Sequence, residues 1–372
     1  MGTSSLAAVA TGGRALHLDE FPVPEVQTTG GLLRVEACGV CGSDLKKYSA
    51  ASMRPTILGH ETVGRIERAG SLAASHWGVR EGDRVLLEEY LPCGHCEYCR
   101  SGEFRSCRRT DTQRAGSLRY GSTPVGVPPA LWGGYSQYQH LHLDSVLHLV
   151  PEGVAPEHAT FALPLGNGIQ WAQLDGGVRT GDTVVIQGPG QQGLGCLLAS
   201  KAAGAGCVIV SGLSRDRRRL RLARTLGADH TVDAETASLP EVVEEVTGGR
   251  GADVVIDNSG AGAATVATAL RVVRKRGAVV LASGGPAGSG TAQAGPALDL
   301  NLIRKRQVTL KGVRGHSYRA VETALAYLAS GGVPLGLVCG PPLGLPDVGL
   351  ALERTAGLVE ADAPHVSVAP WD

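Results

Sequence analysis

Strand-like and helix-like stretches alternate between residues 161 and 311, and this alternation restricts the possible folds more than any other feature of the chain. Runs rich in β-branched residues, such as TVVIQG, CVIVSG and ADVVIDNSG, are separated by helical runs such as GLGCLLASKAAGA, RDRRRLRLARTLGA and AATVATALRVVRKRG. Strands that are joined by helices in this way form right-handed βαβ units. The pattern therefore predicts an α/β domain with a doubly wound parallel sheet that helices cover on both faces.

A glycine-rich turn follows the first strand of this alternation and opens the first helix. Gly188, Gly190, Gln191, Gln192 and Gly193 belong to this turn, GPGQQG, whose glycines have the spacing G-x-G-x-x-G. The first glycine permits a tight turn, the second lets a pyrophosphate approach the backbone, and the third allows the helix to pack closely on the strand. The N–H groups at the start of the helix would bind the anion. The βαβ context favours a dinucleotide site over a glycine-rich turn without a ligand.

The end of the second strand bears on the choice of cofactor. A carboxylate there usually meets the ribose 2′-hydroxyl of NAD, but Gly212 stands at this position. Ser214 and Arg215 follow, and a guanidinium can hold a 2′-phosphate by two parallel hydrogen bonds. We therefore expect NADP rather than NAD. The alternative is that Arg215 only belongs to a solvated helix face and that the cofactor is NAD.

Residues 1–160 follow a different pattern, in which short alternating stretches are broken by glycine and proline. This pattern predicts a smaller, β-rich domain. One loop contains four cysteines with the spacing C-x2-C-x2-C-x7-C, namely Cys93, Cys96, Cys99 and Cys107. Four thiolates can surround a tetrahedral zinc ion and leave no position for a substrate, so we expect a structural site. Inert or disulfide-forming thiols are the alternative, which a reducing compartment disfavours.

Charge and hydropathy argue against several classes of partner. Lys plus Arg and Asp plus Glu number 35 each, so no net field would attract nucleic acid or an anionic membrane. The first residues lack a basic stretch followed by an apolar run, which argues against a secretory signal. The uncharged stretch that ends near Pro346 is interrupted by glycine and proline and is not expected to span a membrane. We expect a cytoplasmic protein that acts on a small molecule.

A second group of possible metal ligands lies upstream of the four-cysteine loop. The segments CGVCGSDLKKY and GHETVG supply Cys41, His60 and Glu61. This mixed set of sulfur, nitrogen and oxygen could hold one zinc ion with a position free for substrate. Taken alone, a cysteine near a strand and a histidine in a turn are more often structural than ligands. Their spacing does not decide between the two possibilities.

The succession of these motifs resembles the zinc-dependent medium-chain dehydrogenase/reductases, which include alcohol, sorbitol and threonine dehydrogenases. The motifs GVCGSD and GHETVG, the four-cysteine loop and GPGQQG occur in the family's order and cover nearly the whole chain. The resemblance implies a GroES-like catalytic domain, formed by residues 1–160 and 312–372, and a Rossmann domain, formed by residues 161–311. It also implies a homo-oligomer, either a dimer or a tetramer.

The resemblance further implies a role for each residue of the upstream group. Cys41 and His60 would bind a catalytic zinc, Glu61 would be a ligand or a close neighbour, Asp44 would support a ligand, and Ser43 would relay the substrate proton. The implied reaction is the reversible oxidation of a primary or secondary alcohol, with hydride transfer to a nicotinamide cofactor. Arg314 aligns loosely with a family position near the cofactor phosphates.

Two departures from the family pattern leave alternatives open. Leu163, in FALPLG, stands where relatives usually carry a further carboxylate ligand before a proline. Lys46 stands where many relatives place a histidine that passes the proton to solvent, and a lysine could do this only with a lowered pKa. Leu163 favours a metal-independent, NADPH-dependent C=C reductase on the same fold, whereas Cys41, His60 and Glu61 together oppose it. A non-catalytic cofactor-binding protein is a further alternative.

Overall fold

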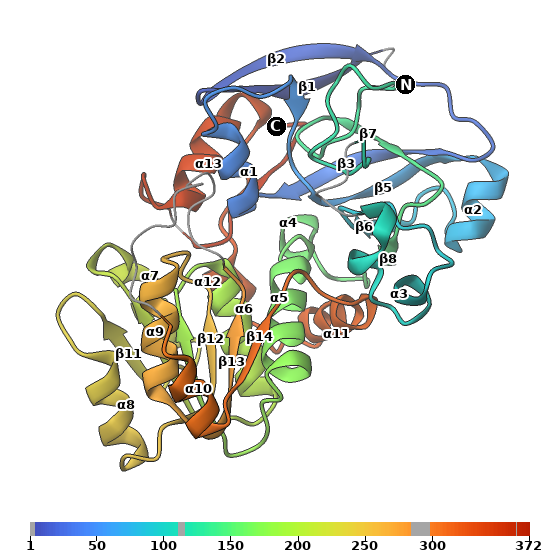
Figure 1. Ribbon diagram of the computed structural model, residues 1–372. Coiled ribbons are helices and arrows are strands. Elements are labelled where there is room, and N and C mark those ends of the chain that lie inside the picture. Colours follow the sequence, from blue (N-terminus) through green and yellow to red (C-terminus); the bar gives the residue numbers. More distant parts are fainter. Residues whose placement is uncertain (1–3, 111–115, 284–297, 362) are drawn as a thin grey trace. The chain divides into compact units, whose positions relative to one another are not determined.

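The computed structural model describes residues 4–110, 116–283, 298–361 and 363–372, and the chain divides into two compact units (Figure 1). Unit 1 comprises residues 1–163 and 317–372, and unit 2 comprises residues 164–316. The limits expected from the sequence, 160/161 and 311/312, remain predictions of where the domains end. Each unit contains its own β-sheets, and no sheet is shared between the two units in the described part of the chain.

Unit 2 contains a parallel sheet of six strands in the order β11-β10-β9-β12-β13-β14. The strand order changes direction between β9 and β12, which is the place where open α/β sheets bind ligands. The strands are β9 (Thr183–Gln187), β10 (Cys207–Gly212), β11 (His230–Asp233), β12 (Ala252–Asp257), β13 (Val273–Leu281) and β14 (Thr309–Gly312).

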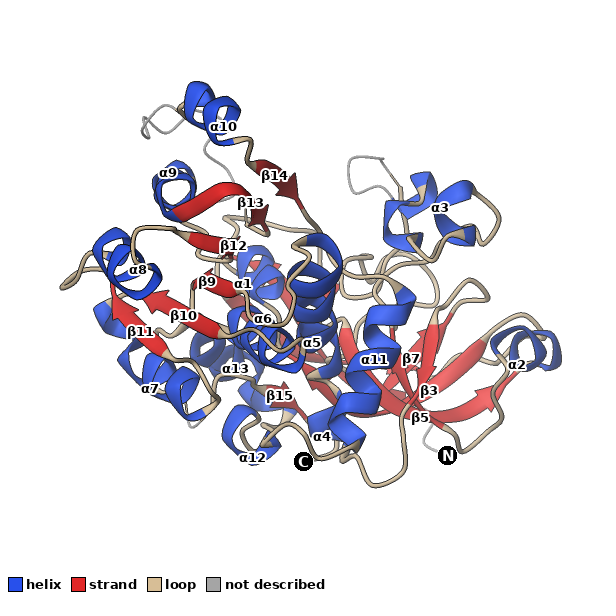
Figure 2. Ribbon diagram, turned by 90° about the horizontal axis from the view of Figure 1, so that it is seen from below, coloured by secondary structure: helices blue, strands red, loops and turns tan. Residues whose placement is uncertain are grey.

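Helices cover both faces of this sheet. Figure 2 shows α8 and α9 on one face and α6 and α7 on the other. Val185, Ile209 and Val255 are fully buried among side chains of α8 and α9, which explains why these strands consist of continuous apolar runs. The predicted doubly wound parallel sheet is confirmed. The helical elements of unit 2 are α5 (Ala162–Gly168), which begins at the end of unit 1, the π-helical segment Ile169–Asp175, α6 (Gln191–Ala202), the 3₁₀ turn Ser214–Asp216, α7 (Arg217–Thr225), α8 (Leu239–Thr247), α9 (Ala263–Val272) and α10 (Leu300–Arg306).

One expected helix is shorter than the sequence suggested. The stretch AATVATALRVVRKRG was expected to be helical throughout, but α9 ends at Val272 and β13 begins at Val273. Val273 pairs with Ala252 of β12 and is almost fully buried. The pairing with β12 therefore overrides the helical pattern at the end of this stretch.

Unit 1 is built from antiparallel strands in two sheets. The first sheet has the order β2-β1-β4, and the second has the order β15-β3-β5-β6-β8, with β7 paired to β3. This part of the molecule confirms the β-rich, GroES-like half of the predicted fold class. The strands are β1 (Ser4–Gly12), β2 (Ala15–Pro22), β3 (Gly31–Gly39), β4 (Thr56–Ile57), β5 (Glu61–Ala69), β6 (Arg84–Leu87), β7 (Tyr138–Leu141), β8 (Leu147–Leu149) and β15 (Ser367–Val368).

Short helices occupy the connections of unit 1. They are α1 (Gly42–Tyr48), α2 (Ser71–Trp77), α3 (Glu97–Arg100), α4 (Pro156–Ala159), α11 (Tyr318–Ala329), α12 (Leu335–Val338), α13 (Val348–Ala356) and the 3₁₀ turns Phe104–Ser106, Arg108–Thr110 and Leu345–Asp347. Among the residues that the structure describes, no helix has both the length and the apolar character needed to cross a bilayer.

Candidate metal centres and nucleotide-binding turn

The pairing of β3 with β5 brings together the upstream group of possible ligands. In this pairing Gly39 lies opposite Glu61. Cys41 therefore follows the end of β3 beside His60 and Glu61 at the start of β5. One ligand atom from each of the three residues lies within 4.8 Å of the others. The three residues are thus arranged as a group that could hold one metal ion.

Two glycines make room for this arrangement. Gly59 has a positive φ of 88°, and a Cβ there would lie 2.7 Å from the ring of Tyr135. A Cβ at Gly39 would lie 2.5 Å from Oε2 of Glu61. Gly59 therefore requires glycine, because of its positive φ and the aromatic ring, whereas a Cβ at Gly39 would displace the Glu61 carboxylate from its place in the group. The backbone is therefore shaped around the side chains that form the group.

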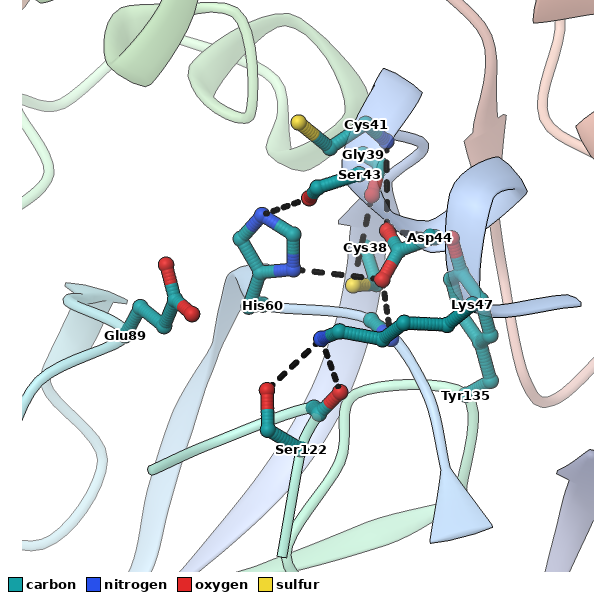
Figure 3. A network of polar contacts seen from close by, with 12 residues as sticks. Cys38, Gly39, Cys41, Ser43, Asp44, Lys47, His60, Glu89, Ser122 and Tyr135 are labelled. Atoms are coloured by element: carbon teal, nitrogen blue, oxygen red, sulfur yellow. Dashed lines mark hydrogen bonds and ion pairs between the residues drawn. The ribbon is translucent and has the colours of Figure 1, made fainter. Parts of the chain in front are cut away.

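Asp44 holds His60 in a defined orientation. Its carboxylate is fully buried and lies 3.3 Å from Nδ1 of His60 (Figure 3). It also accepts hydrogen bonds from the N–H of Cys41 at 3.3 Å and the hydroxyl of Tyr135 at 3.2 Å. A histidine whose Nδ1 faces a carboxylate presents Nε2 to a metal, and such support raises the basicity of the ligand. Sequence reasoning missed Tyr135, which lies 91 residues from Asp44, because no local spacing links them.

The electrostatics of Glu61 fit a cation in this position. The side chain is 3% exposed, and its Oε2 is buried without a hydrogen-bond partner. Burial raises the pKa of Glu61 to about 7, although the neighbouring His60 acts in the opposite direction. A buried, unpaired carboxylate is unfavourable unless a positive charge compensates it. A divalent ion held by Cys41, His60 and Glu61 would supply this charge.

Three further residues that the sequence analysis discussed, Ser43, Lys46 and Leu163, differ from one another in their surroundings. Ser43 Oγ lies 3.4 Å from Nε2 of His60, so the structure brings Ser43 into the group. Lys46 is exposed on α1, whereas its neighbour Lys47 donates to Gly121 O and Ser122 Oγ. Leu163 is buried, with 3% of its surface exposed, and offers no ligand atom.

The four cysteines of the predicted structural site lie together in one lobe of unit 1. Ligand atoms of Cys93, Cys96, Cys99 and Cys107 lie within 4.8 Å of one another, and all nine cysteines of the chain are free thiols. The N–H groups of His95 and Cys96 lower the pKa of Cys93 to about 6. A thiolate is the form that binds a metal. The set fits a closed tetrahedral site with four sulfur ligands.

Arg105 connects this lobe to the sheet. Its guanidinium donates to Oε2 of Glu88 at 2.6 Å and stacks over the ring of Tyr90, 4.9 Å from its centroid. The Glu88 side chain is fully buried and also faces Nε2 of His148 at 3.4 Å. Burial lowers the pKa of Arg105, but the charge of Glu88 and its other acidic neighbours raise it overall. The Arg105 guanidinium is therefore a buried cation that Glu88 and Tyr90 hold next to the four-cysteine lobe.

The glycine-rich turn of unit 2 has the geometry that its sequence predicts. Gly188 has a φ of 103°, and a Cβ on Gly193 would lie only 1.9 Å from Gly188 O. Gly190 precedes α6, and no atom lies within 4 Å of the place where its Cβ would be. Gln191 is almost buried, whereas Gln192 accepts a hydrogen bond from Asn167 at 2.9 Å. The turn leaves open space beside the N-terminus of a 12-residue helix, where a pyrophosphate could bind.

The residues expected to choose the cofactor lie at the end of β10. A Cβ on Gly212 would lie 2.8 Å from Pro189, so this strand end adjoins the glycine-rich turn. The Ser214 hydroxyl donates to Asp233 at 2.7 Å, and its N–H donates to Glu235 at 2.8 Å.

The two predicted arginines of unit 2 are solvent-exposed. Arg215 lies in the 3₁₀ turn that follows β10, next to Ser214. Arg314 follows the end of β14 at Gly312 by two residues.

Comparisons with known proteins agree with this architecture. Residues 28–152 match the family model of the alcohol dehydrogenase GroES-like domain, and residues 193–330 match that of zinc-binding dehydrogenases. A protein of Mycobacterium tuberculosis named "Probable alcohol dehydrogenase" is 39% identical over 331 residues, which cover 88% of each chain. A sorbitol dehydrogenase of Bacillus subtilis is 33% identical over 281 residues, which cover 74% of each chain.

A solved structure extends the similarity to the whole fold. The alcohol dehydrogenase of Thermus sp. ATN1 superposes with a TM-score of 0.82 at 26% identity, over 98% of this chain and 99% of that one. The sequence relatives exceed 30% identity over most of both chains, and the two matched family models lie in the expected order. The chain therefore belongs to the zinc-dependent medium-chain dehydrogenase family, whose members are oxidoreductases that act on the CH–OH group of their donors.

Proposed function

We propose that this protein is an alcohol dehydrogenase or carbonyl reductase that transfers hydride between a nicotinamide cofactor and a small alcohol, ketone or aldehyde. The observation that carries the proposal is the group of Cys41, His60 and Glu61, whose ligand atoms lie within 4.8 Å of one another. When bound, zinc supplies Lewis acidity to the substrate oxygen, and the nicotinamide ring accepts or donates the hydride. The residues of the chain would bind the metal ion, orient its ligands and relay the proton of the substrate.

Each residue of the group has one task in this proposal. Cys41, His60 and Glu61 hold the ion, and Asp44 fixes the ring of His60 through Nδ1. Ser43, whose Oγ lies 3.4 Å from Nε2 of the ligand His60, relays the proton: its hydroxyl takes the proton of the substrate hydroxyl and passes its own proton on towards solvent. Lys46 remains a prediction for the onward relay to solvent. Cys93, Cys96, Cys99 and Cys107 hold a second, structural zinc.

Metal analysis tests this assignment. We expect two zinc ions per chain, one for each cysteine-containing group. Cys41→Ala should keep the structural ion, lose the other and lose alcohol oxidation, whereas the control Cys207→Ala should keep both. A protein that holds one zinc and whose Cys41→Ala variant still reduces activated C=C bonds would be the metal-independent reductase instead. The match to the zinc-binding dehydrogenase model and the relatives named alcohol and sorbitol dehydrogenase do not favour this alternative.

We further propose NADP as the preferred cofactor. No carboxylate side chain projects from Gly212, and the Arg215 guanidinium can grip a 2′-phosphate. Both donors of Ser214 already bind carboxylates, so the preference depends on Arg215. The Michaelis constants for NADP and NAD should differ in favour of NADP, and Arg215→Ala should remove the difference. The matched control is Arg217→Ala on the adjacent helix, which should leave the preference unchanged. An NAD preference that Arg215→Ala does not alter would contradict the choice of NADP.

Location and assembly complete the proposal. A homodimer or homotetramer is the assembly that the family resemblance implies. A cytoplasmic location agrees with the balanced charge of 35 basic and 35 acidic residues. No nucleic-acid or membrane partner is proposed. Arg314 is retained as a candidate contact of the cofactor phosphates.

A further inference from the structure

A string of three polar side chains lies beside the glycine-rich turn of unit 2. Nδ1 of His316 lies 2.8 Å from Oδ1 of Asn167, and Nδ2 of Asn167 donates a hydrogen bond to Oε1 of Gln192 at 2.9 Å. Asn167 belongs to α5, Gln192 to the first turn of α6, and His316 to the chain after β14. Sequence reasoning did not single out Asn167 or His316, because no local spacing links them to the turn.

Close packing of two helices brings the first pair of this string together. A Cβ on Gly168, at the end of α5, would lie 2.2 Å from the carbonyl carbon of Gly195 in α6. A Cβ on Gly195 would in turn lie 2.6 Å from the carbonyl oxygen of Pro164. The two backbones can approach this closely only without side chains between them. Asn167 is therefore held within hydrogen-bonding distance of Gln192.

His316 forms the other end of the string and sets its direction. The residue is buried, with 3% of its surface exposed, and the carbonyl of Gly315 next to it accepts a hydrogen bond from the indole N–H of Trp171 at 2.8 Å. Oδ1 of Asn167 can only accept, so Nδ1 of His316 carries the hydrogen between them. Nδ2 of Asn167 then faces Gln192 as a donor. Each hydrogen bond of the string therefore donates towards the glycine-rich turn.

Gln192 ends the string with an unused donor. Its Oε1 accepts from Asn167, so its Nε2, which carries two hydrogens, is left for another partner. None of the described residues hydrogen-bonds to this Nε2. Gln192 is partly exposed, and open space lies beside Gly190 at the start of the same helix. The string thus adds a side-chain donor to the free N–H groups of the first turn of α6.

The direction of the string suits the groups of a dinucleotide. Phosphate oxygens and the carboxamide oxygen of nicotinamide are acceptors, and an N–H donor forms its strongest hydrogen bonds with charged oxygens. A glutamine amide can turn about its last torsion angle and exchange its oxygen for its nitrogen. If it turned, Oε1 of Gln192 would face these acceptor oxygens and repel them. The hydrogen bond from Asn167 favours the orientation that attracts them.

We propose that Asn167 and His316 are positioning residues that orient the Gln192 side chain, so that its Nε2 donates a hydrogen bond to an acceptor oxygen of the bound dinucleotide. This inference rests on the proposed function, because it takes the glycine-rich turn as the binding site of the nicotinamide cofactor. It adds two residues outside the turn to those that determine cofactor affinity.

A fluorescence titration of the full-length protein tests the donor. The probe is NADPH or NADH, whichever the unmodified protein binds more tightly. Gln192→Leu should weaken binding by about threefold to tenfold, which corresponds to the loss of one hydrogen bond. Asn167→Leu should weaken it by a similar or smaller factor, because Gln192 would then be free to turn. Asn301→Leu, at an exposed position on α10, is the matched control and should bind like the unmodified protein.

Double variants separate a positioning role from a purely structural one. If Asn167 acts through Gln192, Asn167→Leu should have no further effect on affinity once Gln192→Leu is present. His316→Leu should behave like Asn167→Leu, and its effect should also disappear in the Gln192→Leu background. This second cycle tests the string independently if Asn167→Leu fails to fold. Additive losses, or an unchanged affinity in Gln192→Leu, would overturn the proposal.

A shorter ligand identifies the acceptor oxygen. ADP-ribose, with a 2′-phosphate where NADPH is the probe, keeps the diphosphate and lacks nicotinamide. An equal loss in Gln192→Leu for this ligand and for the whole cofactor would place the acceptor on the diphosphate, and a loss for the whole cofactor alone would place it on the carboxamide. If the unmodified protein bound neither NADPH nor NADH, the proposed function itself would fail. If it bound one of them equally well with and without Gln192→Leu, only the role of the string would fail.

Discussion

At the scale of single residues, the buried carboxylate of Asp44 decides how well His60 can act as a ligand. It lies 3.3 Å from Nδ1 of His60. We expect Asp44→Asn to weaken zinc binding at the Cys41 group by about tenfold to hundredfold, as measured by competition with a chelator. Asp19→Asn is the control, because Asp19 forms a similar but exposed pair with His17. Unchanged zinc retention in Asp44→Asn would contradict this role.

Two glycines of the nucleotide-binding turn have different roles: one is needed for the packing of the turn, and the other leaves space for the cofactor. A Cβ on Gly193 would collide with Gly188 O at 1.9 Å, whereas a Cβ on Gly190 would meet nothing within 4 Å. Gly193→Ala should therefore lower the thermal unfolding temperature. Gly190→Ala should leave this temperature unchanged and weaken NADPH binding in a fluorescence titration, because the methyl group would occupy the space for the pyrophosphate. Equal effects of the two variants on both measurements would contradict this division.

At the scale of elements, Asp253 ties neighbouring strands of the parallel sheet together. It accepts hydrogen bonds from the N–H of Thr183 in β9, from Arg250 and from Arg274 in β13. Burial raises its pKa, but these hydrogen bonds lower it more strongly, to about 2. The folded pKa lies below the ordinary value of 3.8. The stabilisation is therefore present above pH 3.8 and is lost as the pH falls towards 2.

This pKa shift predicts how a variant of β12 depends on pH. Asp253→Asn should have a lower free energy of unfolding than the unmodified protein at pH 7, and the difference should shrink as the pH falls from 3.8 towards 2. Urea unfolding at a series of pH values measures this. Glu244→Gln, at an exposed position on α8, should behave like the unmodified protein throughout. A difference that does not depend on pH would show that the charge of Asp253 is not responsible.

At the scale of the whole molecule, unit 1 is assembled from the two ends of the chain. His148 of β8 bonds to Glu322 of α11, 174 residues away, through Nδ1 at 2.5 Å. Burial lowers the pKa of His148, but its hydrogen bonds to Glu322 and Glu88 raise it overall. This stabilisation is therefore complete below the ordinary pKa of 6.5 and is lost as the pH rises through the folded pKa.

The contact with α11 thus predicts a pH dependence opposite to that of Asp253. Glu322→Gln should lower the free energy of unfolding by about 1 kcal/mol at pH 6, since Glu322 is half-exposed. The variant and the unmodified protein should converge at higher pH. Arg319→Gln on the same helix is the control. Chemical unfolding at both pH values measures the difference, and a loss that grows with pH would contradict the assignment.

Much of the fold and part of the site could be predicted because their signals are local. The alternation of β-branched and helical runs, the spacing of four cysteines within one loop, and Gly188 and Gly193 in one turn depend on residues that are close in sequence. The end of α9 could not be predicted, because the pairing of Val273 with Ala252 involves a distant strand. The orientation of His60 by Asp44 and Tyr135 likewise depends on contacts across the fold.

The sequence by itself determined the chemistry that the chain can offer: thiolates, an imidazole and a carboxylate for metals, and a glycine-rich turn for a dinucleotide. Only the tertiary structure decided which groups meet. The pairing of β3 with β5 gathers Cys41, His60 and Glu61, and the buried carboxylate of Asp44 lies 3.3 Å from Nδ1 of His60. Side-chain type and local spacing are properties of the linear chain, whereas proximity between distant segments arises only when strands pair and a core is buried.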